Sequence, residues 1–221
     1  MPTAFHQPTG KLFVIGGGGH AIVVTEAARA AGWPIVGYFD DSDEAQVDPH
    51  TPHLGTMRDA SSTSNARAEG VARSIIALGS IELRQRLVLD LPGEYAVVVH
   101  PRAWISPSAT LAPGTFVGAM AVVQGRAVVG PHGIINTGAV VEHDCRLGSN
   151  VHLAPGAILG GGVTVGANTL IGIGARVRPG VRIGGGCTVG AGAAVVRDVP
   201  DGMTVAGVPA RRTESFAIDD S

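Results

Sequence analysis

Aromatic side chains are scarce in this sequence, which has 5 Phe, 2 Tyr and 2 Trp among 221 residues. A conventional core depends on aromatic bulk, so we expect this core to consist of small and branched aliphatic residues. Cysteine is also scarce, since only Cys145 and Cys187 are present. Two cysteines can form neither a disulfide framework nor a four-ligand zinc site.

A basic surplus is missing too, because 16 Lys and Arg stand against 18 Asp and Glu, for a formal net charge of −2. A carrier of nucleic acid would need an excess of basic residues. No segment approaches the roughly 18 apolar residues that span a bilayer. The N-terminus, MPTAFHQPTG, lacks the basic start and apolar run of a signal peptide. These absences predict a cytoplasmic protein with no membrane span and no nucleic-acid partner.

Glycine is abundant, with 33 residues, and much of it belongs to a repeat of period six. From Ile105 to Val195 every sixth residue is Ile, Leu or Val, and a small residue follows each of them four positions later. A period of six fits neither an α-helix nor a simple amphipathic strand. It is typical of a β-helix in which three hexads form a coil of about 18 residues. The sixteen hexads therefore predict about five coils.

Each position within a hexad has a predicted environment. The aliphatic residue fills the interior, and the small residue fits a tight corner. Cys145 and Cys187 occupy the small position, which identifies them as packing residues. The runs Gly160–Gly162 and Gly184–Gly186 suit corners that require unusual backbone angles.

The first hundred residues alternate between strand and helix patterns instead. The predicted strands are 11–15, 34–39, 74–78 and 96–99, and the predicted helices are 20–31, 58–69 and 81–89, the last one capped by Ser80. Residues 43–56 are predicted to form a loop, and the C-terminal SFAIDDS to be frayed. The alternation indicates a small parallel sheet. The fold class is thus α/β plus all-β, with a Rossmann-like domain over 1–99 and a β-helix with a short tail over 100–221.

A glycine-rich turn follows the first predicted strand and opens the first predicted helix. Gly16, Gly18 and Ala21 match the pattern G-x-G-x-x-G/A, and Asp40 lies about 20 residues further on. Amides at a helix N-terminus bind phosphate, and a carboxylate at this spacing binds ribose. A hundred residues hold only half of a dinucleotide domain. We therefore expect a nucleotide-linked sugar rather than NAD; the alternative is a plain tight turn.

His143 is the third residue of its hexad, so its side chain should point away from the core. Its neighbour Asp144 can orient the imidazole. Gly161 lies 18 residues later, one coil on, where its amide N–H could face a developing oxyanion. The alternative is a surface histidine in a permissive position. Asn136 and His152 make the same coil unusually polar.

Metal binding is disfavoured by the histidine spacing. His132, His143 and His152 are separated by 11 and 9 residues, so they do not stack along one edge of the coils.

Together these motifs resemble the bacterial hexapeptide-repeat sugar acetyltransferases. The resemblance rests on the turn ending in His20, on Phe39-Asp40-Asp41, on Ile135-Asn136-Thr137 and on Glu142-His143-Asp144. The family includes N-acetyltransferases of nucleotide-linked 4-amino-4,6-dideoxy sugars and sialic acid O-acetyltransferases. It implies a left-handed parallel β-helix, a homotrimer, acetyl-CoA between neighbouring β-helices and no metal. The favoured substrate is GDP-perosamine, followed by a UDP-linked bacillosamine precursor.

The resemblance also assigns roles to residues. His143 would be the catalytic base, next to Asp144 where the family often has Glu. The nucleotide-linked sugar would bind to a set of residues in both halves of the chain, namely Gly17, Gly18, Gly19, His20, Asp40, Asp41 and Asn136. Acetyl-CoA would contact His152, Gly161, Ala206, Pro209 and Arg211.

Three functions remain open at this point. The first is N-acetylation of a nucleotide-linked amino sugar, and the second is O-acetylation of a sialic acid or related sugar. The third is a non-enzymatic nucleotide-binding trimer. A γ-class carbonic anhydrase is disfavoured by the histidine spacing.

Overall fold

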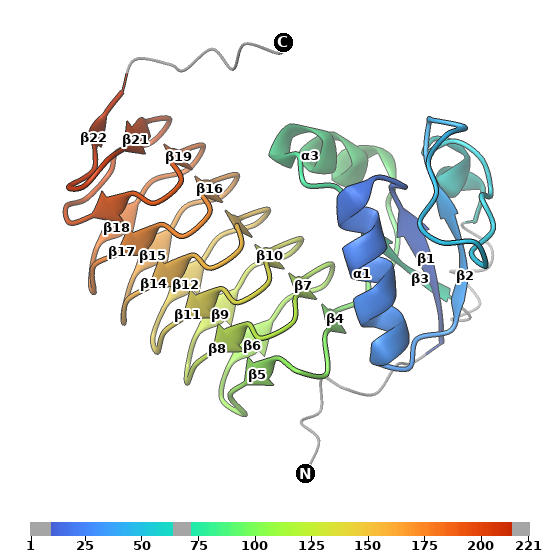
Figure 1. Ribbon diagram of the computed structural model, residues 1–221, viewed down its shortest axis with the longest axis horizontal. Coiled ribbons are helices and arrows are strands. Elements are labelled where there is room, and N and C mark those ends of the chain that lie inside the picture. The colour runs from blue at the N-terminus through green and yellow to red at the C-terminus, as the bar shows by residue number, and fades with distance from the viewer. Residues whose placement is uncertain (1–9, 64–71, 214–221) are drawn as a thin grey trace.

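The computed structural model describes residues 10–63 and 72–213, and it places a small parallel sheet beside a long stack of coils (Figure 1). The sheet has the order β2-β1-β3, and its strands are β1 (Lys11–Ile15), β2 (Ile35–Phe39) and β3 (Ala72–Ile76). The central strand β1 is buried from Leu12 to Ile15. The predicted parallel sheet is confirmed, although β3 begins and ends two residues earlier than predicted.

Two helices accompany this sheet. Helix α1 (Gly19–Ala30) begins at the glycine-rich turn, and Gly32, with φ +86°, follows its end. Helix α3 (Ile81–Asp90) begins as predicted, because the Ser80 hydroxyl accepts a hydrogen bond from the Leu83 amide.

The predicted helix over 58–69 is wrong where it can be compared. A 3-10 helix (Asp59–Thr63) forms there, and residues 64–69 lie outside the described residues. Ser and Thr hydroxyls compete with helical hydrogen bonds, and the Ser61 hydroxyl donates to the Arg58 carbonyl.

The predicted strand 96–99 belongs to a different sheet from the one expected. Ala96 still bonds to Ser74 of β3, but β4 (Val98–Val99) pairs with β7 in the coils. Val99 lies six residues before Ile105 and is buried in the same core, so it begins the repeat one hexad earlier.

The coils form a left-handed parallel β-helix with three faces, as the repeat and the resemblance predict. The face nearest the N-terminal sheet contains β4, β7 (Phe116–Val117), β10 (Ile134–Ile135), β13 (His152–Leu153), β16 (Leu170–Ile171), β19 (Thr188–Val189), β21 (Thr204–Ala206) and β22 (Arg211–Arg212). The second contains β5 (Trp104–Ile105), β8 (Val122–Val123), β11 (Val140–Val141), β14 (Ile158–Leu159), β17 (Arg176–Val177) and β20 (Ala194–Val195). The third contains β6 (Thr110–Leu111), β9 (Val128–Val129), β12 (Arg146–Leu147), β15 (Thr164–Val165) and β18 (Arg182–Ile183).

The interior of the coils contains both predicted series. Neighbouring coils pair residues 18 apart, such as Val141 with Leu159. The aliphatic series and the small series are buried throughout, including Cys145 and Cys187. The buried Thr115 and Thr169 hydroxyls donate to backbone carbonyls at their corners, which satisfies both groups.

The corners contain a regular left-handed position, three residues after the aliphatic. Gly162 and Gly186 occupy it with φ +70° and +64°, which confirms the expectation for the glycine runs. Six other residues adopt the same conformation without being glycine, namely Met120, Arg126, His132, Asp144, Asn150 and Asn168. The left-handed conformation is strained for any residue other than glycine. The coils therefore carry outward side chains at these six corners at a cost in backbone free energy.

A buried arginine joins the two parts of the molecule. Arg84 of α3 is 1% exposed, and its Nε donates to Asn150 Oδ1 at 2.7 Å. Its Nη1 donates to the Leu78 carbonyl at 2.7 Å. Burial lowers the pKa of Arg84 to about 10, so the guanidinium stays protonated at neutral pH.

The C-terminal strands β21 and β22 form an antiparallel pair at the end of the coils (Figure 1). SFAIDDS, predicted to be frayed, lies outside the described residues. Among the residues described, 10–63 and 72–213, no helix has the length and apolar character needed to cross a bilayer.

Candidate active site

The glycine-rich turn presents unobstructed backbone at the N-terminus of α1. A side chain at Gly16 or Gly17 would collide, because a Cβ there would lie 2.8 Å from Leu78 and 2.7 Å from Ala45 respectively. Gly18 and Gly19 face open space instead. Gly18 is the N-cap and has no side-chain cap, so the first amides of the helix are available to an anion.

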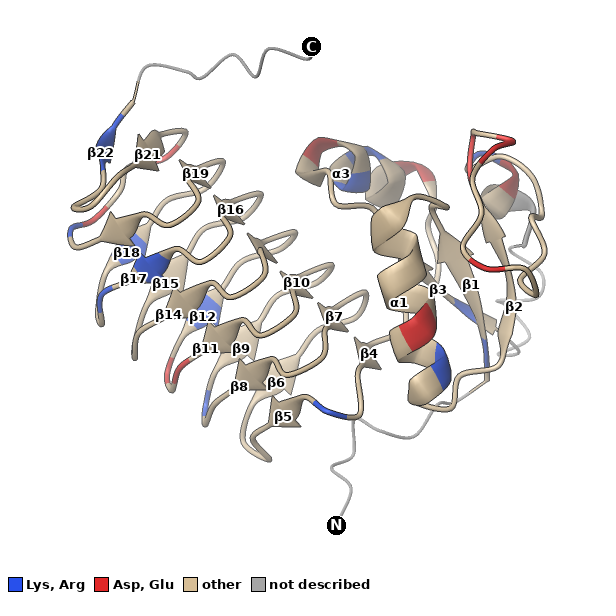
Figure 2. Ribbon diagram, viewed as in Figure 1, with Lys and Arg blue, Asp and Glu red and all other residues tan. Residues whose placement is uncertain are grey.

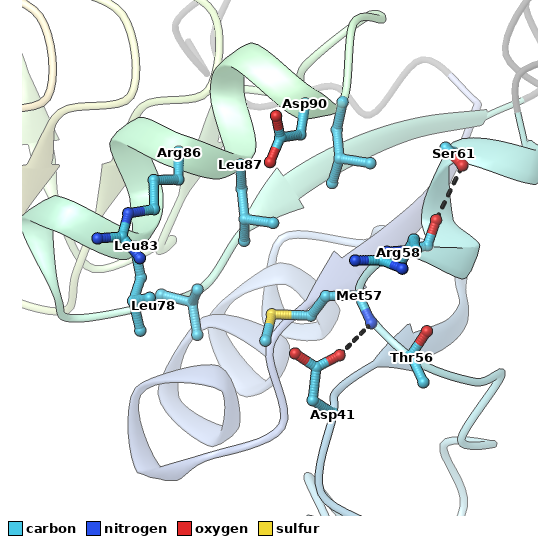
Figure 3. A pocket seen from close by; sticks show the side chains of 11 residues that line it. Asp41, Thr56, Met57, Arg58, Ser61, Leu78, Leu83, Arg86, Leu87 and Asp90 are labelled. Carbon is cyan, nitrogen blue, oxygen red and sulfur yellow. Dashed lines mark hydrogen bonds between the residues drawn. The ribbon is translucent and has the colours of Figure 1, made fainter.

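The two aspartates after β2 have different surroundings. Asp40 Oδ2 accepts from the Gly17 amide at 2.6 Å, and its Oδ1 accepts from the Ser42 amide at 2.9 Å. Asp40 thereby holds the glycine turn in place. Asp41 Oδ1 accepts from the Met57 amide at 2.9 Å, and the side chain lines a cavity of about 840 Å³ (Figure 3).

The cavity lies between Asp41, the segment 56–61 and helix α3. Its apolar wall includes Met57, Leu83 and Leu87, and its charged groups include Arg58 and Asp90 (Figure 3). An apolar wall with a few charged groups is the usual composition of a small-molecule site. Leu78 also lines the cavity, and its side chain lies against Gly16. The cavity therefore adjoins the glycine turn.

His20, Asn136 and His152 come together where α1 meets the face of β10 and β13. The His20 and His152 rings are 6.2 Å apart, and Asn136 Nδ2 lies 3.4 Å from His152 Nε2. His152 Nδ1 is 3.2 Å from the Gly79 carbonyl, which only accepts, so this nitrogen carries the proton. We call this group the junction cluster.

Burial keeps both histidines of the junction cluster neutral. It lowers the pKa of His20 and of His152 to about 4, and the positive charge of Arg84 adds to the effect. The His20 Nε2 is enclosed and has no hydrogen-bond partner among the described residues. A buried polar atom without a partner indicates a place where a ligand can bond.

His143 lies at a corner of the coils, with its side chain 60% exposed. It points away from the core, as its place in the hexad predicts. Its Nδ1 is 2.8 Å from Asp144 Oδ2, so Nδ1 donates to the carboxylate and Nε2 is left with the lone pair. Arg126 binds the same carboxylate through two hydrogen bonds of 2.6 and 2.7 Å. These bonds and the His143 contact hold the pKa of Asp144 well below its usual range. We call His143, Asp144 and Arg126 the corner cluster.

Gly161 lies directly above His143, as the 18-residue spacing predicts. A Cβ at Gly161 would be 2.7 Å from His143 Nε2, so glycine is required for this approach. In the part of the chain that the structure describes, the Gly161 amide has no hydrogen-bond acceptor, whereas the Gly162 amide donates to the His143 carbonyl. The His143 ring thus packs against a glycine whose amide has no acceptor within the described residues.

The two clusters lie on opposite sides of one β-helix. His152 is on the face that touches the N-terminal sheet, and His143 is at the corner between the other two faces. The aliphatic interior separates them. A single chain therefore does not bring the predicted base together with Asn136, His20 and His152.

The predicted acetyl-CoA residues near the C-terminus form a separate group. Ala206 ends β21, and Pro209 follows a cis peptide bond. Arg211 lies in β22 and lines a second cavity of about 200 Å³. Figure 2 shows further basic residues on β12, β17 and β18, which belong to the same β-helix.

Sequence reasoning missed Arg126 and Arg84. A signal for Arg126 was present, because it precedes Asp144 by one coil and carries the opposite charge. Arg84 had no comparable signal, since it lies in helix α3 and its partner Asn150 is 66 residues away in the β-helix. Among residues 10–63 and 72–213, no group of three His, Cys, Asp or Glu side chains is placed to hold a metal ion.

Family models and solved structures resemble this chain over most of its length. Residues 11–91 match the PglD N-terminal domain. Residues 162–197 match the bacterial transferase hexapeptide (six repeats), and residues 138–172 match the hexapeptide repeat of succinyl-transferase. A search of curated proteins gave no match.

Three of the similar structures contain ligands. PerB from Caulobacter crescentus, in complex with CoA and GDP-perosamine, is 41% identical, with a TM-score of 0.84, over 94% of this chain and 99% of that chain. A histidine-to-asparagine mutant of perosamine N-acetyltransferase from the same organism, with the same ligands, is 40% identical, with a TM-score of 0.85, over 94% and 99%. The acetyltransferase domain of PglB from Neisseria gonorrhoeae, with acetyl coenzyme A, is 39% identical, with a TM-score of 0.85, over 93% and 100%.

Proposed function

The chain belongs to the family of hexapeptide-repeat, acetyl-CoA-dependent sugar N-acetyltransferases, and from this premise we propose that it acetylates the 4-amino group of a nucleotide-linked 4-amino-4,6-dideoxy sugar. GDP-perosamine is the favoured substrate, because relatives at 40 and 41% identity were solved with it. The observation that carries the proposal is the corner cluster, where His143 has a fixed proton on Nδ1 and a lone pair on Nε2 facing Gly161.

The proposed reaction is direct transfer. Neutral His143 removes a proton from the sugar amine as the nitrogen attacks the thioester carbonyl of acetyl-CoA. The carbonyl oxygen becomes an oxyanion, which the free Gly161 amide stabilises. The intermediate collapses as the C–S bond breaks, and the imidazolium protonates the leaving CoA sulfur. Cys145 takes no part as a nucleophile, because it is buried and burial raises the pKa of its thiol.

The nucleotide would bind along the N-terminal sheet. The free amides of Gly18 and Gly19 suit the diphosphate. The cavity beside Asp41 suits the nucleoside. The unpartnered His20 nitrogen and Asn136 lie where the sugar would reach the β-helix.

The site requires a second copy of the chain. His143 and the junction cluster face opposite sides of the β-helix, so His143 of one subunit would meet His20, Asn136 and His152 of a neighbour. This arrangement accords with the homotrimer and the intersubunit acetyl-CoA that the family resemblance implies. The C-terminal residues Ala206, Pro209 and Arg211 and the basic residues on β17 and β18 would contact CoA (Figure 2).

The test is CoA thiol release from acetyl-CoA with a panel of acceptors. The panel contains GDP-perosamine, UDP- and dTDP-linked 4-amino-6-deoxy sugars and free sialic acid. We expect a rate with one nucleotide-linked amino sugar, and a loss of roughly 10²- to 10⁴-fold in His143→Ala. Circular dichroism would verify that the variant is folded. Activity on sialic acid alone would replace N-acetylation by O-acetylation, and silence on the whole panel would leave a nucleotide-binding trimer.

A further inference from the structure

We propose that Arg126 is a positioning residue for the His143–Asp144 pair, which fixes the carboxylate and offsets its charge. This inference rests on the proposed role of His143 as the base. Arg126 touches neither His143 nor Gly161 through a hydrogen bond in the described structure, so it would act only through Asp144.

The hydrogen bonds define one orientation of the carboxylate. Arg126 Nε donates to Asp144 Oδ1 at 2.6 Å, and Nη2 donates to Oδ2 at 2.7 Å. The same Oδ2 accepts from His143 Nδ1 at 2.8 Å. A two-pronged contact with a planar guanidinium fixes both the place and the plane of a carboxylate. The imidazole plane and the direction of its Nε2 lone pair are then determined through Asp144.

The backbone supports this pair from both sides. Arg126 and Asp144 occupy the left-handed corner position in consecutive coils, with φ +60° and +61°. The Arg126 amide donates to Ser108 Oγ at 3.1 Å, and the Asp144 amide donates to the Gly125 carbonyl at 3.1 Å. Exposed ion pairs are usually weak because two mobile side chains must be ordered. Here both side chains extend from corner backbone that these hydrogen bonds between coils already hold in place.

The charges around His143 make Arg126 the group that balances Asp144. Its own coil contributes Asp144 and Glu142, whose Oε2 accepts from the His143 amide at 3.3 Å. The preceding coil contributes Arg126, and the following coil places Gly161 and Gly162, which do not titrate, against His143. An uncompensated carboxylate beside an imidazole favours the protonated imidazolium, which cannot act as a base. Arg126 supplies the positive charge that pairs with Asp144.

Two substitutions separate charge from geometry. Arg126→Gly removes the side chain at a position where most corners have glycine, so it places no strain on the backbone. Arg126→Lys keeps a positive charge but loses the two-pronged contact. The readouts are kcat, the KM for both substrates, and kcat/KM as a function of pH with the acceptor that the wild-type enzyme uses.

We expect Arg126→Gly to shift the acid limb of the profile upward by about 0.5 to 1 pH unit. Its kcat at neutral pH should fall about tenfold, with KM values within about twofold. Arg126→Lys should restore the acid limb to its wild-type position and recover part of kcat.

The control is Arg73→Met, which removes an exposed arginine from an ion pair with Glu94 in the N-terminal part. It should leave the pH profile unchanged. An inactive wild-type enzyme would contradict the proposed function itself. An active wild type combined with an unshifted acid limb in Arg126→Gly would overturn the role of Arg126, whether or not kcat falls. So would an Arg126→Lys profile that matches that of Arg126→Gly.

Discussion

At the scale of single residues, histidines differ in this chain because their surroundings differ. His143 is largely exposed and paired with a carboxylate, which suits a base. His20, His132 and His152 are buried near the Arg84 charge, and burial lowers the pKa of each to about 4. At neutral pH these three act as neutral hydrogen-bonding or packing groups. The same residue type thus differs in exposure and charge environment between the corner and the junction.

Buried His132 should make the free energy of unfolding depend on pH. Its pKa is about 4 in the folded chain and near 6.5 when unfolded, so the unfolded state binds more protons between these values. The contribution of His132 to the free energy of unfolding is therefore fully present above about pH 6.5. It is lost as the pH falls toward 4, by at most about 1.4 kcal/mol per pH unit for this one group. His132→Asn keeps a residue that tolerates the left-handed corner and should flatten this dependence.

The measurement is urea denaturation at pH 7.5 and at pH 5. The control is His50→Asn, which changes an exposed histidine in the loop after β2. If His132→Asn lost as much stability on acidification as the wild type, the burial argument would be contradicted.

At the scale of the coil, glycine serves two separate purposes. Gly174 has φ +65° and open space around it, so its role is conformational. Gly166 has no positive φ, but a Cβ there would lie 2.3 Å from the Gly185 backbone nitrogen of the next coil. Its role is to allow two strands to meet closely at a corner.

These two roles predict unequal costs. Gly174→Ala should lower the free energy of unfolding by about 1 to 2 kcal/mol, which is the cost of a left-handed residue. Gly166→Ala should cost about 3 kcal/mol or more, because backbone must move apart. Denaturant titration of both variants would test the difference, and similar losses would contradict it.

At the scale of the whole molecule, the β-helix separates the two clusters, and only the junction cluster lies against the N-terminal part with its glycine-rich turn. The proposed assembly resolves this separation by placing each corner cluster against a neighbour's junction cluster. A closed ring of identical heterologous contacts would contain one such site per interface.

Mixing two inactive variants tests the shared site. His143→Ala lacks the base, and His152→Ala alters the junction cluster, so we expect each alone to be strongly impaired. In a randomly mixed assembly about one quarter of interfaces would pair an intact His143 with an intact His152. Activity should recover to about that fraction of the wild type. Two affinity tags, one on each variant, would verify that mixed assemblies form. If mixed assemblies form but recover no activity, the shared site is contradicted.

The sequence alone determined the β-helix, its buried series and the neighbours of His143 within the coils. A repeat of six makes the direction of each side chain depend on its place in the hexad, and a stacking offset of 18 places Gly161 over His143. The same offset relates Arg126 to Asp144. The glycine turn was equally readable, because its requirements are local. For these features, nearby sequence contains the whole physical cause.

Only the tertiary structure decided which elements meet across the junction. It assigned β4 to the coils, replaced a predicted helix by the 3-10 helix Asp59–Thr63, and brought Arg84 to Asn150. It also set the burial that keeps His20 and His152 neutral. The physical reason is that burial, strand partners and buried charge are set by groups far away along the chain, and no local pattern records them.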